Sequence, residues 1–274
     1  MSSRIASTLG GTVSSTVSAP VAIVTGAASG IGRATARRLA SRHLLVVGVD
    51  IDESGLEQTA VAIAAEGGRF VALRADVSDD TECARIVHHT LQHGRLTVLC
   101  NVAGISPYDQ SVLEATPEQW ERVLAVNVGS VFFMTRHAAP SMAASGGGVI
   151  VNTASVHAFA TQRGCAPYAA SKGAIVALTR QLALELVGDG IRVVAVAPGS
   201  VDTPMSHAAV QQVGSSLAEM GFSSDPRAAG RVGSADEVAA VIDFLASDAA
   251  SFVNGTTVVA DGALLASLTM GSNS

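Results

Sequence analysis

Short apolar runs alternate with helix-length segments along nearly the whole chain of 274 residues. The runs predict strands at 20–25, 44–49, 69–75, 96–100, 148–151, 191–197 and 256–260. The segments between them predict helices at about 33–41, 54–66, 80–93, 117–144, 167–187 and 235–247. Strands that alternate with helices form parallel sheets with right-handed crossovers. The sequence therefore predicts an α/β fold, a single-domain Rossmann-type doubly wound parallel sheet of about seven strands with helices on both faces.

Length and composition favour one domain of this kind. Hydrophobic residues make up 48% of the chain and charged residues 15%, which is enough to bury a large core. Residues 1–19 are rich in Ser and Thr, with Arg4 as their only charge, and are predicted to be a disordered extension. A single domain is expected over 20–274, with a loop-rich segment at 205–231.

Several function classes are disfavoured by charge and residue usage. The net charge of −6 argues against a nucleic-acid partner, and no apolar run is long enough to predict a membrane span. The chain has three widely spaced cysteines, Cys83, Cys100 and Cys165. They predict neither a disulfide framework nor a metal cluster, and they favour a reducing cytoplasm. The histidines at 88, 89 and 93 lack an acidic or cysteine partner at ligand spacing, so we expect no metal site.

A glycine-rich turn, GAASGIG at 26–32, joins the first predicted strand to the first predicted helix. Glycines let a backbone approach a pyrophosphate closely, and a helix N-terminus offers unpaired N–H groups and a positive dipole end. The spacing is GxxxGxG rather than the commoner GxGxxG, so a glycine turn without a ligand is the alternative interpretation.

The second predicted strand ends on Asp50, 18 residues after Gly32. A carboxylate at this position accepts hydrogen bonds from the adenosine ribose of a dinucleotide and repels a 2′-phosphate. Arg33 is the nearest basic residue in the sequence. The alternative is that Asp50 or Asp52 caps the helix that begins near Glu53.

Polar or glycine-bearing segments also follow later strands. Asp76-Val77 follows the third strand, Asn101-Val102-Ala103-Gly104 the fourth, and the segment 198–203 the sixth. The carboxyl ends of parallel strands meet at one edge of the sheet, where cofactors bind. A helix cap is the alternative role for Asp76.

A serine, a tyrosine and a lysine follow the fifth predicted strand. Ser155 comes soon after that strand, and Tyr168 and Lys172 lie four residues apart, on one face of the next helix. An ammonium beside a phenol favours the ionised phenol that acid–base chemistry needs. Asn127, in the middle of an apolar helical stretch, indicates a buried polar contact. A solvent-facing Tyr/Lys pair and an Asn in a helix seam are the alternatives.

In this order and spacing, the motifs make the chain resemble the classical branch of the short-chain dehydrogenase/reductase family over about 21–262. The resemblance rests on Thr25-Gly26-x-x-x-Gly30-x-Gly32, Asp76, Asn101-x-Ala103-Gly104, Asn127, Ser155, Tyr168-x-x-x-Lys172 and Pro198-Gly199. Two departures are Val102, where the family usually has a second asparagine, and Ala263, where it usually has a second glycine.

The resemblance implies an enzyme that interconverts a secondary alcohol and a ketone by hydride transfer to or from a nicotinamide cofactor, and Asp50 predicts that this cofactor is NAD. It implies that Tyr168 is the general acid/base, that Ser155 holds the substrate oxygen, and that Lys172 makes the phenol more acidic and binds the nicotinamide ribose. Asn127 would hold a water linked to Lys172. The implied cofactor contacts are Thr25, Gly26, Ser29, Gly30, Ile31, Gly32, Asp50, Ile51, Asp76, Val77, Asn101, Ala103, Gly104, Tyr168, Lys172, Pro198, Gly199, Val201 and Thr203.

Two other functions stay open, an imine or enoyl reductase of the same fold and a non-catalytic NAD-binding regulator. The intact Ser155 and YxxxK motif favours carbonyl and alcohol chemistry over both. The expected substrate wall comprises 106–110, 157–165 and 205–227, with Cys165 at the pocket entrance and without a catalytic role. The expected partners are a small alcohol or ketone and further copies of the chain in a homotetramer, paired through the helices at 117–144 and 167–187.

Overall fold

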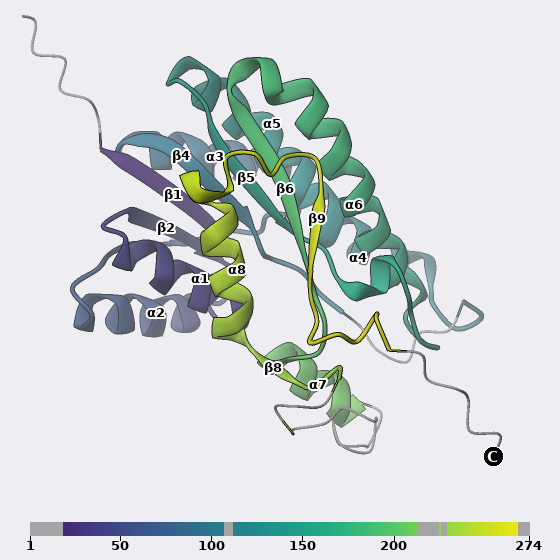
Figure 1. Ribbon diagram of the computed structural model, residues 1–274. Helices are drawn as coiled ribbons and strands as arrows, with labels where there is room; N and C mark the ends of the chain where they lie inside the picture. Colours follow the sequence, from purple (N-terminus) through teal and green to yellow (C-terminus); the bar gives the residue numbers. More distant parts are fainter. Residues whose placement is uncertain (1–18, 107–111, 213–224, 226–228, 268–274) are drawn as a thin grey trace, which may run out of the picture.

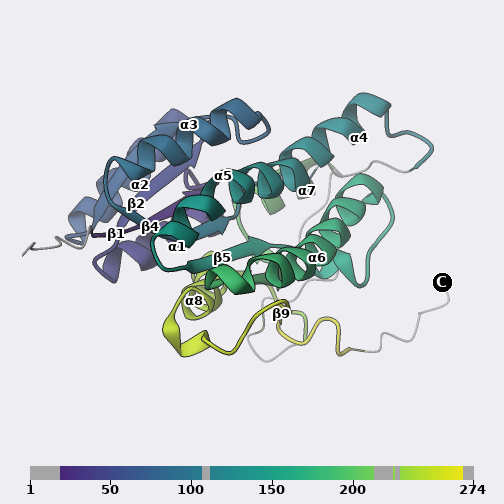
Figure 2. The same ribbon diagram turned by 90° about the horizontal axis from the view of Figure 1, so that it is seen from above.

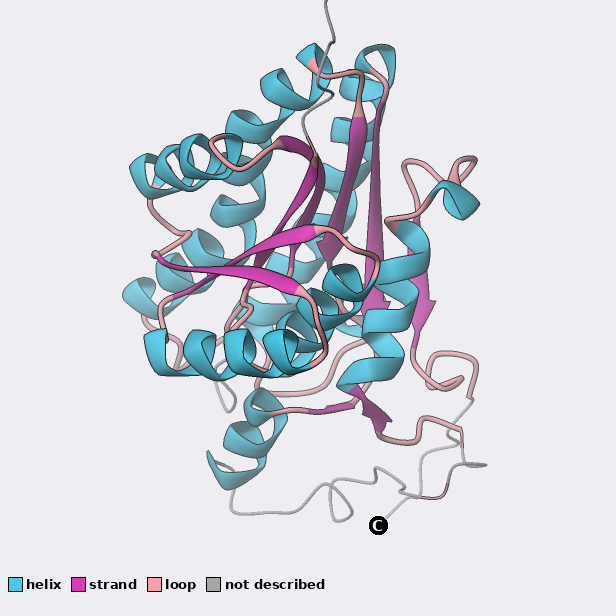
Figure 3. Cartoon of the chain, turned by 90° about the vertical axis from the view of Figure 1, so that its left-hand side faces the viewer, coloured by secondary structure: helices cyan, strands magenta, loops and turns pink. Residues whose placement is uncertain are grey.

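The computed structural model describes residues 19–106, 112–212, 225 and 229–267, so the predicted N-terminal extension lies almost wholly outside the described residues. Seven strands form one parallel sheet in the order β3-β2-β1-β4-β5-β6-β9. Figure 3 shows the strands of the molecule in magenta with helices around them. Their bounds are β1 Pro20–Thr25, β2 Leu45–Asp50, β3 Arg69–Arg74, β4 Arg95–Asn101, β5 Gly148–Thr153, β6 Ile191–Pro198 and β9 Thr257–Ala260. The predicted seven-stranded doubly wound sheet is confirmed.

Two layers of helices cover the sheet (Figures 1 and 2). On one face, α1 (Gly30–Ser41), α2 (Glu53–Ala65) and α8 (Ala235–Leu245) bury Leu39, Ile63 and Ile242 against the strands. On the other face, α3 (Asp80–Leu91), α5 (Ser130–Ala144) and α6 (Ala166–Leu186) bury Ile86, Met134 and Leu182. The central strands are buried on both faces, which is why they are apolar without alternation. Within the described ranges, every helix is too short or too polar to cross a bilayer.

Capping residues define where the helices begin. Asp52 accepts a hydrogen bond from the Gly55 N–H at the start of α2, so the cap is Asp52 rather than Asp50. Thr116 and Ser234 form capping boxes with Gln119 and Glu237 at the starts of α4 (Pro117–Leu124) and α8. These bonds satisfy N–H groups that have no partner within the helix.

The predicted helical stretch at 117–144 is confirmed, and it contains one irregularity. The structure divides it into α4, a π-helical turn η1 (Ala125–Gly129) and α5. A π-turn accommodates an extra residue without breaking the helix, and such turns are frequent at functional sites. Asn127 lies inside this turn and is fully buried.

Shorter elements complete the chain. They are η2 (Val156–Ala158), η3 (Val187–Asp189), β7 (Val201–Asp202), α7 (Pro204–Gln212), β8 (Gly233–Ser234) and η4 (Asp248–Ala250). β7 and β8 pair in a separate two-stranded sheet. The segment 205–231, predicted to be loop-rich, therefore begins with a helix, and most of its remainder lies outside the described residues.

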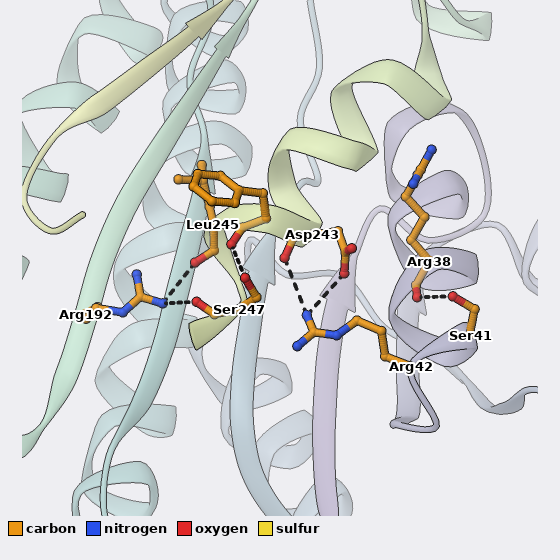
Figure 4. Close-up of polar contacts among 8 residues, drawn as sticks. Arg38, Ser41, Arg42, Arg192, Asp243, Leu245 and Ser247 are labelled. Carbon is orange, nitrogen blue, oxygen red and sulfur yellow. Dashed lines mark hydrogen bonds and ion pairs between the residues drawn. The ribbon is translucent and has the colours of Figure 1, made fainter. Parts of the chain in front are cut away.

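Helix α8 is held by two arginines from neighbouring elements (Figure 4). Arg42, just after α1, forms an ion pair with Asp243 at 3.1 Å. Arg192 of β6 donates to the carbonyl oxygens of Leu245 and Ser247 at 3.0 and 3.1 Å. A cation at the carboxyl end of a helix also interacts favourably with the helix dipole.

The sheet order reverses between β1 and β4. The chain runs outward from β1 to β3, returns to β4 and continues outward to β9. In doubly wound sheets, ligands bind at the carboxyl ends of the strands where the order reverses. Thr25 and Asn101, the last residues of β1 and β4, mark this position.

Candidate active site

A cavity of about 870 Å³ opens at the carboxyl ends of the strands. The predicted site residues that line it are Gly26, Ser29, Gly30, Ile31, Gly32, Asp50, Ile51, Asp76, Val77, Ala103, Gly104, Ser155, Tyr168, Lys172, Pro198, Gly199, Val201 and Thr203. The structure thus brings residues from segments almost 180 positions apart in the sequence into one space. Thr25, Asn101 and Asn127 are not among its lining residues.

The glycine turn packs too tightly for side chains at two positions. A Cβ added at Gly32 would lie 1.9 Å from the carbonyl oxygen of Gly26, so the first turn of α1 has room only for a glycine at this position. Gly26 has a φ of +70°, in the left-handed region, and a Cβ there would lie 3.0 Å from the backbone of Ala103. The N-terminus of α1 therefore faces the cavity with its N–H groups close to any ligand.

Residues 27 and 28 of this turn are hydrogen-bonded to β2 and α2. The Ala28 N–H donates to Asp50 Oδ2 at 3.1 Å, and Thr59 Oγ1 donates to the Ala27 carbonyl at 2.9 Å. Arg33 donates to the Ala28 carbonyl and, at 3.0 Å, to Thr59 Oγ1. These hydrogen bonds hold the glycine turn in place. The Arg33 guanidinium takes part in them and does not line the cavity.

Asp50 lies at the rim of the cavity beside the exposed side chain of Ile51. It also accepts the Asp52 N–H at 3.1 Å, which leaves lone pairs for a ligand. Its register partner on β3 is Arg74, a cation that the sequence spacing did not reveal and that does not line the cavity.

Asp76 is joined to a residue that the sequence analysis missed. Arg122 of α4 lines the cavity, forms an ion pair with Asp76 at 3.4 Å and donates to Ser78 Oγ at 3.0 Å. Burial opposes ionisation of Asp76, but the Ser78 hydrogen bonds and the Arg122 charge outweigh it and lower the pKa of Asp76. The only sequence signal for Arg122 was a charge on an amphipathic helix.

Thr25 and Asn101 support the cavity wall from behind. Thr25 Oγ1 accepts the N–H groups of Val102 and Ala103 at 3.0 and 3.1 Å and so holds the turn after β4. Asn101 donates to Asn152 Oδ1 at 2.9 Å on the neighbouring strand. Both side chains are buried, so we expect them to act on a ligand only through the segments that they position.

Ser155 and Tyr168 lie on the same wall of the cavity. Ser155 Oγ accepts the His157 N–H at 3.2 Å, which leaves its own hydroxyl hydrogen available to a ligand. Tyr168 is half-buried near the start of α6, and its ring lies edge-on to the His157 ring with the centroids 5.4 Å apart. Both side chains therefore border the space that a ligand would occupy.

Lys172 lies one helical turn behind Tyr168. Its Nζ donates to the Thr153 carbonyl at 2.8 Å and lies 5.5 Å from the centre of the Tyr168 ring. The side chain is 4% exposed, and burial lowers the pKa of Lys172 to about 8. A buried cation next to a phenol favours the ionised phenol, but removing the ammonium from water costs desolvation free energy.

Asn127 connects the π-helical turn to the loop after β4 and to α6. Its side chain accepts the Ile105 N–H at 2.8 Å and donates to the Ile105 carbonyl and to Ser171 Oγ, each at 3.0 Å. A Cβ at Gly104 would lie 3.2 Å from Asn127 Oδ1 and 3.6 Å from Lys172 Nζ. Asn127 thus holds the segment that faces Lys172, without lining the cavity itself.

The expected position of Cys165 is wrong. The side chain is 2% exposed and is not among the cavity-lining residues, because Cys165 directly precedes α6 and packs inward. Burial also raises the pKa of its thiol. Phe159 and Arg163 do not line the cavity either, whereas His157, Gln162 and Met205 do. The expected wall segments at 107–110 and 213–224 lie outside the described residues.

The cavity fits a nicotinamide dinucleotide. The α1 N-terminus and glycine turn suit the pyrophosphate, and Asp50 suits the ribose hydroxyls. Ile51, 58% exposed at the rim, offers an apolar surface for a base. Thr153 Oγ1 is buried without a hydrogen-bond partner among the described residues at the wall next to Lys172.

Comparisons with known proteins agree with this geometry. A family model described as enoyl-(acyl carrier protein) reductase matches residues 26–264. The chain is 38% identical over 245 residues to the meso-2,3-butanediol dehydrogenase of Serratia marcescens, covering 89% of this chain and 94% of that protein. It is similar to a solved levodione reductase, with a TM-score of 0.85, 36% identity, and coverage of 91% and 98%. It is also similar to an actinorhodin polyketide ketoreductase with NADPH, with a TM-score of 0.83, 33% identity, and coverage of 90% and 97%.

Proposed function

The chain belongs to the short-chain dehydrogenase/reductase family, and we propose that within it the protein is an NAD-dependent oxidoreductase that interconverts a secondary alcohol and a ketone. The observation that carries the proposal is the convergence of Ser155, Tyr168 and Lys172 on one cavity that also contains the glycine turn. Acid–base groups and a dinucleotide cradle in one space suit transfer of a hydride and a proton between alcohol and cofactor.

Ser155, Tyr168 and Lys172 each have a separate role in the proposed reaction. The bound nicotinamide supplies the hydride acceptor for oxidation. Ser155 Oγ donates its free hydrogen to the substrate oxygen and orients it. Tyr168 Oη, ionised, takes the proton of the alcohol during oxidation and returns it to the ketone oxygen during reduction. The buried charge of Lys172 stabilises the ionised phenol, while its remaining N–H groups bind the ribose next to the nicotinamide.

We predict that NAD is preferred over NADP, because the Asp50 carboxylate repels a 2′-phosphate. Arg33 does not compensate, since its guanidinium is bonded to the Ala28 carbonyl and Thr59. The kcat/KM for NAD should exceed that for NADP, and Asp50→Ala should narrow the ratio by at least about tenfold, which corresponds to about 1.4 kcal/mol. Equal use of both cofactors by the unmodified enzyme would contradict this prediction.

Two rival functions are weaker. The matching family model carries the name of an enoyl reductase, but the intact Ser155 and Tyr168-x-x-x-Lys172 motif, whose side chains line one cavity, favours carbonyl chemistry. A non-catalytic NAD-binding regulator has no need of a buried lysine beside a tyrosine. The deciding experiment follows absorbance at 340 nm with secondary alcohols, ketones and an enoyl thioester. Turnover of the thioester alone would replace the proposed reaction.

We predict a homo-oligomer that forms through α5 and α6, whose outer surfaces carry exposed apolar side chains. Phe132 of α5 and Leu184 of α6 are 46% and 73% exposed, and a groove of about 320 Å³ runs between the two helices. Apolar surface of this kind is typical of an interface. Light scattering at micromolar concentration should give a multiple of 27.6 kDa, four copies for the expected tetramer, and Phe132→Glu should lower it. A monomer mass for the unmodified protein would reject the prediction.

A further inference from the structure

A hydrogen-bonded pair, His157 and Thr161, lines the cavity next to the reacting side chains. His157 Nδ1 lies 2.9 Å from Thr161 Oγ1, and its ring lies edge-on to Tyr168. The backbone N–H of the same histidine donates to Ser155 Oγ. The imidazole is thus fixed in the cavity lining beside the ring of Tyr168.

The second ring nitrogen of His157, Nε2, has no partner among the described residues, although burial shields much of the ring from water. Burial lowers the pKa of His157, so the imidazole is neutral at neutral pH. Because the Thr161 hydroxyl can rotate, Nδ1 can either donate or accept, and Nε2 then takes the opposite role. A partly buried nitrogen of this kind is satisfied by a hydroxyl or carbonyl oxygen of a ligand.

We propose that the His157–Thr161 pair binds a second, neutral oxygen on the carbon next to the reacting one, so that the substrates are vicinal diols and α-hydroxy ketones. This inference rests on the proposed function and names the substrate class of the same site. Oxidation converts one carbinol of the diol to a carbonyl, with the hydride leaving to the cofactor and the proton to Tyr168. The second hydroxyl is unchanged and remains bonded to His157.

The charges of the cavity favour a neutral substrate over a 2-hydroxy acid. The imidazole of His157 is neutral, and the charged side chains among the described lining residues are Asp50, Asp76, Arg122 and Lys172. Arg122 is paired with Asp76, and Lys172 is bonded to the Thr153 carbonyl behind Tyr168. Gln162 adds a neutral polar group, and Ala160 and Val156 add apolar surface for short alkyl groups. Among the described residues that line the cavity, therefore, no cation is available to form an ion pair with a substrate carboxylate.

Three alcohols with the same reacting group test the proposal, namely butane-2,3-diol as an isomer mixture, butan-2-ol and lactate. The unmodified enzyme should oxidise the diol with a kcat/KM at least about tenfold above the other two, since one buried hydrogen bond is worth about that factor. His157→Phe keeps a ring against Tyr168 and removes both nitrogens, so the diol to butan-2-ol ratio should fall at least about tenfold. His157→Gln should recover part of that ratio.

His88→Phe is the matched control, because His88 is an exposed residue of α3 outside the cavity. It should leave the ratio as in the unmodified enzyme. Equal kcat/KM for diol and butan-2-ol, or an unchanged ratio in His157→Phe, would overturn the proposed substrate class while leaving alcohol oxidation intact. Lactate turnover equal to that of the diol would overturn the neutral-substrate argument. If none of the three alcohols changes absorbance at 340 nm with NAD or NADP, the proposed function itself fails.

Discussion

Tyr168→Phe is expected to lower kcat for alcohol oxidation by about 10³-fold or more while NAD affinity stays within about threefold. The phenylalanine keeps the ring and its edge-on contact with His157, but it removes the hydroxyl that we propose exchanges the substrate proton. General acid–base groups contribute about 10²–10⁴ to a rate, so the loss should lie in that range. Stopped-flow turnover at 340 nm and titration of NAD binding measure the two quantities separately.

The pH dependence provides a second readout for the same side chain. Oxidation requires the ionised phenol and should decline as the pH falls, whereas ketone reduction requires the protonated phenol and should persist at lower pH. In the Tyr168→Phe variant, the pH profiles of any residual oxidation and reduction should no longer differ in this way. A folded variant that keeps near-native turnover would show that Tyr168 is not the acid/base and would restore the interpretation of a structural Tyr/Lys pair.

Lys172→Met is expected to abolish most turnover and weaken NAD binding, yet to stabilise the folded protein without cofactor. Burial lowers the pKa of Lys172 from 10.5 to about 8. Between pH 8 and 10.5, the unfolded chain therefore binds a proton that the folded chain has lost. Below pH 8 the folded protein bears the full cost of the buried charge, which is about 3 kcal/mol for this shift. Methionine removes that cost, and loss of the Thr153 hydrogen bond returns about 1 kcal/mol of it.

Urea unfolding of the unmodified protein and of the Lys172→Met variant at pH 7 and pH 10 checks the direction of this change in stability. The variant should be more stable at pH 7, and the difference should shrink as the pH rises through the window from 8 to 10.5. Lys172 is the only lysine in the sequence, so lysine labelled at the ε-carbon gives a single resonance whose titration reports its pKa directly. A midpoint near 10.5 with no gain in stability at pH 7 would show that the charge is not desolvated.

The strands were predictable from the sequence because short, continuous apolar runs are typical of buried parallel strands. β1 was predicted with its observed bounds, since a continuous apolar run that ends at a glycine turn is typical of a buried parallel strand. The glycine turn, Asp50 and the Tyr168 helix followed from spacing alone. Helix α7 was missed because its sequence, PMSHAAVQQ, has too few apolar residues for a clear period.

Side-chain direction was the part that sequence could not supply. Thr25 and Asn101 are at the strand ends where cofactor contacts were expected, but their side chains point inward to backbone and side-chain partners. Arg122 and Arg74 approach the predicted carboxylates only after folding, from residues 46 and 24 positions away. Cys165 lies three residues before Tyr168, and the direction of its side chain was set by packing at the start of α6 rather than by proximity in sequence.

The number of residues in this helix sets how α4 is rotated about the helix axis relative to α5. Each residue of an α-helix advances by about 100°. The π-helical turn already accommodates one extra residue, so a further residue inserted between 125 and 129 would rotate α4 by about that angle relative to α5. Arg122 would then leave Asp76 at one end of the cavity, and Asn127 would leave Ile105 at the other. Point substitutions along α4 and α5 are local changes, whereas an insertion or deletion alters both ends together. Grafting or loop redesign in this protein must therefore keep the residue count from 117 to 144 unchanged.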